Sequence, residues 1–100
     1  MNEEYQPWMP ITDIKDLKCL GKLGEECGEL SQVICRIIIQ GFEENNPDTG
    51  MPNKIWLEKE IADVLANIRL VTEKFNLNYA SIAARREVKY TKIKHWQENM

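Results

Sequence analysis

The sequence GEECGELSQVICRIIIQ, residues 24–40, combines the apolar pattern of a helix with acidic residues on the same face. Leu30, Val33 and Ile37 recur at spacings of three and four, which is the period of one helix face. With residues placed about 100° apart around the helix, Glu26 falls inside this apolar stripe and Glu29 falls on its edge. A buried carboxylate without a partner is unstable, so it must bind a proton or a cation.

The helix that contains this stretch is predicted to span residues 13–40. Thr12 or Asp13 can cap its first turn, and the apolar pattern stops at Gly41. Three glycines between residues 21 and 28 weaken its middle. They leave open either a break near Gly21 or a close approach to another helix, because glycine removes bulk.

The remaining chain predicts two further helices and no strand, since no stretch of alternating apolar residues is present. Residues 1–11 contain two prolines and are predicted to form an irregular arm, and the Gly-, Pro- and Asn-rich residues 41–53 a loop. Asn53 and Asn78 are the expected caps of helices over residues 54–75 and 79–97. We therefore expect one all-α domain, residues 1–100, in which an antiparallel helical hairpin is followed by a third helix.

Composition is that of a folded protein, with 43% hydrophobic and 29% charged residues. A domain of 100 residues buries a modest share of its surface, which makes self-association plausible. No apolar run approaches the ~20 residues needed to cross a bilayer, so no membrane contact is expected. The acidic N-terminal residues lack the pattern of a signal peptide, and we expect a cytoplasmic protein.

Charge is unevenly distributed along the chain. Residues 1–75 carry eight basic and fourteen acidic side chains, a balance of −6, whereas residues 76–100 carry five basic and two acidic ones, a balance of +3. An acidic body argues against nucleic acid as a partner. The cationic last segment can still serve a small anionic ligand.

The predicted second helix repeats the acidic arrangement of the first in the segment EIADVL, residues 60–65. Glu60 falls inside its apolar stripe, Asp63 falls on the edge, and Asn67 lies next to both. Two such acidic pairs facing each other would repel, and a divalent cation reverses that balance. Carboxylate oxygens suit Mg²⁺, with Mn²⁺ as a second choice, and the single histidine and unpaired cysteines argue against zinc.

The acidic pairs also have an ordinary structural interpretation. Glutamates three residues apart are common on solvated helix faces, and Lys22 can neutralise Glu26 at the i+4 position. The third helix adds Arg86 and Lys89 inside its own apolar stripe. These cations either bind phosphate oxygens opposite the acidic cleft or form ion pairs with the same carboxylates.

The two acidic motifs together resemble those of the MazG-like nucleotide pyrophosphohydrolases, which belong to the all-α NTP pyrophosphatase group. The family signature EExxE, a gap, then ExxD is matched by residues 25–29 and 60–63. The resemblance implies that Mg²⁺ is bound by the four acids Glu26, Glu29, Glu60 and Asp63. It implies hydrolysis of a nucleoside triphosphate to a monophosphate and pyrophosphate, with Glu26 or Glu29 as the catalytic proton acceptor.

Four residues are expected to bind the substrate: Lys22, Asn67, Arg86 and Lys89. The resemblance implies this role for Asn67 and Arg86, and it implies an assembly; Lys22 and Lys89 are included because they are cations placed beside the acids and beside Arg86. Members of the family form dimers or tetramers, so a four-helix-bundle-type core would be completed on dimerisation. Two features depart from the family pattern: the gap between Glu29 and Glu60 is longer, and Tyr90 stands where an asparagine is frequent.

A different class of function fits the same residues. The chain would then be a catalytically inactive helical module that binds a partner or another copy of itself. In that case the acids would be ion-paired with Lys22, Arg86 and Lys89. The sequence does not distinguish base or sugar preference, dimer from tetramer, or whether Glu25 takes part in catalysis.

Overall fold

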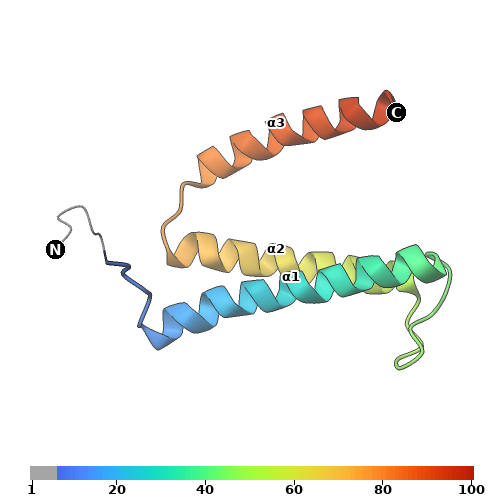
Figure 1. Cartoon of the computed structure of the whole chain (residues 1–100), viewed down its shortest axis with the longest axis horizontal. Coiled ribbons are helices and arrows are strands. Elements are labelled where there is room, and N and C mark those ends of the chain that lie inside the picture. The colour runs from blue at the N-terminus through green and yellow to red at the C-terminus, as the bar shows by residue number, and fades with distance from the viewer. Residues whose placement is uncertain (1–6) are drawn as a thin grey trace.

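A computed structural model describes residues 7–100 as three helices joined by irregular segments (Figure 1). The helices are α1, Ile14–Gln40, α2, Asn53–Lys74, and α3, Tyr79–Glu98. Within the described residues no strand is formed, and the loop between α1 and α2 holds one isolated bridge, Asn45 with Pro52. The all-α prediction is confirmed, while residues 1–6 of the predicted arm lie outside the described residues.

Helix α1 begins and ends where its local signals predict. The Asp13 carboxylate accepts a hydrogen bond from the Asp16 N–H at 3.0 Å, and Gly41 ends the helix with φ at 88°. The helix is continuous through its three glycines, and an added Cβ at any of them would meet nothing within 4 Å. Neither the break near Gly21 nor a close helix approach is therefore present in the single chain.

Helices α1 and α2 lie side by side and antiparallel, and their contact contains the small core (Figure 1). The apolar residues buried there are Cys19 and Val33 on α1 and Val64 and Val71 on α2. At the open end of the hairpin, Lys74 Nζ lies 3.3 Å from Asp16 Oδ1. Few apolar side chains are fully buried in this contact, so the buried polar residues Glu26, Asn53 and Glu60 make up a large part of it.

Helix α3 runs apart from the hairpin (Figure 1). The Asn78 side chain accepts a hydrogen bond from the Ser81 N–H at 2.9 Å, which confirms the predicted cap. No residue of α3 is buried, and its apolar stripe, which includes Ile82, Ile93 and Trp96, is exposed. A helix of this kind gains stability mainly from packing its apolar face, and the described chain offers little that covers this one.

The predicted cap of α2 at Asn53 is wrong. Pro52 precedes the helix without a side-chain cap, and Asn53 is its first residue and fully buried. The Asn53 side chain donates instead to the end of α1, to Gly41 O at 3.0 Å and Gln40 Oε1 at 3.3 Å. The last carbonyls of a helix lack intrahelical donors, so the amide is more useful there than as a cap.

The state of the cysteines and the possibility of a membrane span follow from the described chain. The three cysteines are free; Cys19 is packed in the core, whereas Cys27 and Cys35 are exposed. Of the helices in the described chain, none is long and apolar enough to cross a membrane.

Candidate metal centre

Three acidic side chains from two helices converge at the middle of the hairpin. Glu26 of α1 and Glu60 and Asp63 of α2 each place one carboxylate oxygen within 4.8 Å of the others. Glu26 is 6% exposed and Glu60 5% exposed, while Asp63 lies half-buried at the edge. The angular placement predicted from the sequence therefore brings these three residues together, and we refer to them as the acidic cluster.

Each of the two buried glutamates has one oxygen that no group in the described part of the chain satisfies. Within residues 7–100, Glu26 Oε2 and Glu60 Oε2 are buried and have no hydrogen-bond partner. A buried acceptor without a donor costs free energy of about 1–3 kcal/mol, and more when the group is charged. A cation bound to these oxygens would remove that cost. The two unpaired oxygens are therefore the observation on which the proposed chemistry of the site depends.

Two lysines form ion pairs with the Oε1 atoms of these two glutamates. Lys22 Nζ lies 3.1 Å from Glu26 Oε1 and 3.5 Å from Glu25 Oε1. Lys59 Nζ lies 3.7 Å from Glu60 Oε1 and 3.8 Å from Asp63 Oδ2. The Lys22–Glu26 pair follows from the i+4 spacing given above, whereas Lys59 was missed although it stands four residues before Asp63.

The environment of these groups shifts two pKa values. The charge of Glu26 raises the pKa of Glu29, and desolvation, a hydrogen bond to Glu26 and the charge of Glu60 add to the rise. Hydrogen bonding to Glu26, with the charge of Glu25, raises the pKa of Lys22. Glu29 is thus electrostatically joined to the acidic cluster, although its oxygens lie outside the group of three that meets within 4.8 Å.

The four residues predicted to bind substrate lie in different places. Lys22 is at the cluster, and Asn67 is one turn beyond Asp63, where its side chain donates to Asp63 O at 2.8 Å. Arg86 and Lys89 are on α3, and the described ion pair of Arg86 is with Glu87, at 3.3 Å. In the single chain the structure brings Lys22 and Asn67 to the acids and leaves Arg86 and Lys89 on the separate helix.

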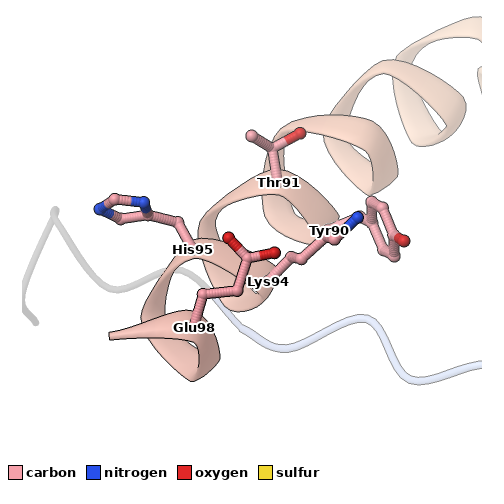
Figure 2. A pocket seen from close by; sticks show the side chains of 5 residues that line it. All are labelled: Tyr90, Thr91, Lys94, His95 and Glu98. Atoms are coloured by element: carbon pink, nitrogen blue, oxygen red, sulfur yellow. The ribbon is translucent and has the colours of Figure 1, made fainter. Parts of the chain in front are cut away.

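Two hollows lie away from the acidic cluster. A groove of about 770 Å³ between α2 and α3 is lined by Leu65, Ile68, Arg69, Thr72, Glu73, Tyr79, Ile82 and Arg86. A second hollow lies on the last turns of α3, where the lining side chains all come from one helix and point in different directions (Figure 2). Neither hollow gathers the convergent polar groups of a small-molecule site.

The donor set of the acidic cluster defines which metal fits. Carboxylate oxygens are hard ligands, and the cluster contains no nitrogen or sulfur donor. His95, the single histidine, is near the C-terminal end of α3. The residues present therefore fit Mg²⁺ or Mn²⁺ and do not fit a structural zinc ion.

Comparison with known proteins does not identify the chain. No family model, no curated protein and no solved structure matches it. The resemblance of the two acidic motifs to those of the MazG-like proteins therefore stays a prediction based on those residues.

Proposed function

We propose that this protein is a Mg²⁺-dependent nucleoside triphosphate pyrophosphohydrolase that releases a nucleoside monophosphate and pyrophosphate in a nucleotide-pool housecleaning role. The observation that carries the metal dependence is the pair of buried, unsatisfied Oε2 atoms on Glu26 and Glu60. The EExxE and ExxD motifs, which resemble those of the MazG-like family, support the choice of reaction. The acidic cluster would hold the cation, with Glu29 as the further ligand that the resemblance of the motifs implies.

When bound, the cation would neutralise phosphate oxygens and lower the pKa of a coordinated water. The chain's own residues supply the other tasks. Glu26 or Glu29 is the candidate proton acceptor, because both carboxylates belong to the motif beside which the cation and its coordinated water would lie. Lys22, half-exposed beside Glu26, is placed to donate from its ammonium to a phosphate oxygen of the substrate.

A homo-oligomer belongs to the same proposal. Arg86 and Lys89 lie on a helix without a buried residue, and the uncovered stripe of that helix carries Ile82 and Ile93. Packing α3 against a second copy would cover these residues and bring the basic segment 76–100 towards the acidic hairpin of the partner. The expected assembly is a dimer or tetramer in the cytoplasm.

The direct experiment is a panel of canonical and modified nucleoside triphosphates incubated with Mg²⁺ and analysed for products. We expect monophosphate and pyrophosphate in equal amounts, with loss of both in Glu60→Gln. Glu58→Gln is the matched control, since Glu58 is exposed on the same helix and carries the same charge. Direct release of inorganic phosphate would show that a different bond is cut, and no turnover of any nucleotide would remove the enzyme assignment.

A helical partner-binding module is the second candidate function, and one observation favours it. Each buried glutamate already has a lysine near its Oε1 atom, so the acids are partly neutralised without a cation. Calorimetric titration with Mn²⁺ separates the two candidates. Binding that Glu60→Gln abolishes supports the hydrolase, whereas no binding at millimolar metal supports the module.

A further inference from the structure

We propose that Asn53 is a positioning residue that fixes the register of α2 against α1 and so keeps the acidic cluster together. The role of the cluster as a cation site is the function proposed above, and the inference about Asn53 rests on it in part. The contacts of Asn53 itself are independent of any metal.

The apolar part of the hairpin seam defines register poorly. Its buried members are Cys19, Val33, Val64 and Val71, four side chains of similar size. Small side chains interlock less than large ones, so these four buried groups by themselves constrain sliding only weakly.

The acidic cluster is far more sensitive to such a slide. Its three carboxylate oxygens lie within 4.8 Å of one another, and one turn of an α-helix advances about 5.4 Å. A shift by a single turn would therefore move Glu60 and Asp63 out of reach of Glu26. A polar contact that can form in one register alone would oppose such a shift.

Asn53 provides that constraint at the closed end of the hairpin. Its side-chain amide joins the first residue of α2 to the last turn of α1, by donating to Gly41 O and to Gln40 Oε1. Its backbone N–H donates to Glu44 O at 2.8 Å, which also ties the loop to the start of α2. Asn53 precedes Glu60 by seven residues, two turns along the same face, so the position of Asn53 determines the height of Glu60.

The burial of Asn53 favours a role in register over one in stability. The side chain is 0% exposed, and within the described chain its Oδ1 has no hydrogen-bond partner. A buried amide that is only partly satisfied is a poor stabilising element compared with an apolar side chain of the same size. A single buried asparagine can nevertheless specify register in paired helices, at a cost in stability.

The test is the variant Asn53→Leu, read out in three ways. We expect Mn²⁺ binding at least about tenfold weaker by calorimetry, as for residues that orient metal ligands, with a melting temperature equal to or above that of wild type. Spin labels at Cys35 and at Arg69→Cys, an exposed position on α2 that is displaced from Cys35 along the hairpin axis, should in a Cys27→Ser background report a distance changed by about 3–5 Å or a broadened distribution. Val33→Ala is the control, because it should lower the melting temperature without changing the distance.

Each outcome decides the proposal. Wild-type affinity and distance in Asn53→Leu would overturn it, and so would a lower melting temperature with an unchanged distance, since that indicates a purely structural role. If Asn53→Leu fails to fold, Gln40→Leu removes one acceptor of the amide and should weaken binding and broaden the distance distribution; an unchanged distance overturns the proposal. If wild type binds no metal, the metal site fails and the distance alone decides the role of Asn53.

Discussion

Glu26 and Glu60 are buried against each other from different helices, and each keeps one oxygen without a hydrogen-bond partner in the described chain. Lys22 and Lys59 approach only the Oε1 atoms, and both lysines are about half-exposed. The lysines thus neutralise the pair in part and leave the two Oε2 atoms available. This relationship separates the cluster from the acidic pairs that are common on solvated helices.

A divalent cation should stabilise the fold through this pair. At a metal concentration one hundred times Kd, binding adds about 2.7 kcal/mol to the free energy of unfolding. For a domain of this size that corresponds to a rise in melting temperature of roughly 10–20 °C. Calorimetric or fluorescence melting with and without Mn²⁺ measures it.

Glu60→Gln should melt at or above the wild-type temperature without metal, because a repulsive charge is removed, and should show no rise with Mn²⁺. Glu58→Gln should retain the wild-type rise. A metal-induced rise that persists in Glu60→Gln would place the cation elsewhere.

Lys22 should compete with the cation for Glu26. Its ammonium lies 3.1 Å from Glu26 Oε1, and a hydrogen bond between these groups is the main cause of the raised pKa of Lys22. Lys22→Met should therefore lower the melting temperature of the metal-free protein and strengthen Mn²⁺ binding severalfold. Lys18→Met, an exposed lysine one turn earlier on α1, is the control, and titration calorimetry is the measurement. Equal affinities in wild type and Lys22→Met would mean that the ion pair does not persist in solution.

Glu29 should give the metal-free protein a recognisable pH dependence. Its pKa is raised above the usual 4.5, first by the charge of Glu26, so between 4.5 and the raised value the folded state binds more protons than the unfolded chain. Stability contributed by this group therefore increases as the pH falls through that window. The charged form destabilises the fold fully above the raised pKa, and the effect is absent below 4.5.

Comparison of wild type with Glu29→Gln isolates this group from the other acids. The variant should be the more stable protein above the window, and the difference should close as the pH is lowered. Denaturant unfolding at a series of pH values measures it, with Glu58→Gln as the control of equal charge. A difference that is constant across pH would show that Glu29 is not coupled to Glu26.

Local signals were sufficient to predict much of this fold. The caps at Asp13 and Asn78 and the stop at Gly41 each depend on residues within one turn, and each lies where expected. The convergence of Glu26 with Glu60 was also predictable, because both fall inside the apolar stripe of their own helix and two such stripes face each other in a hairpin.

The parts that could not be predicted depend on tertiary packing. Asparagine is a common N-cap residue, so local signals favour a cap at Asn53. Its burial against Gly41 depends instead on the path of the preceding loop. That loop is held by internal hydrogen bonds, such as the one from Asp48 N–H to Asn46 Oδ1 at 2.7 Å. Arg86 lies in the apolar stripe of α3 as the pattern indicates, yet a stripe does not define what covers it. The sequence could therefore place Arg86 on a face but not opposite a particular partner.

The uncovered stripe of α3 should be the surface through which copies associate. Ile82 and Ile93 are 39% and 44% exposed in the single chain, so covering the remaining area of each contributes about 1 kcal/mol. In a symmetric dimer each substitution acts twice, so Ile93→Asp should convert an oligomer to a monomer at micromolar concentration. Light scattering coupled to size-exclusion chromatography measures the mass, and circular dichroism checks that helicity is kept. Val88→Asp, the same kind of change on a different face of α3, should leave the assembly intact, and a wild-type protein that stays monomeric at high concentration would contradict the prediction.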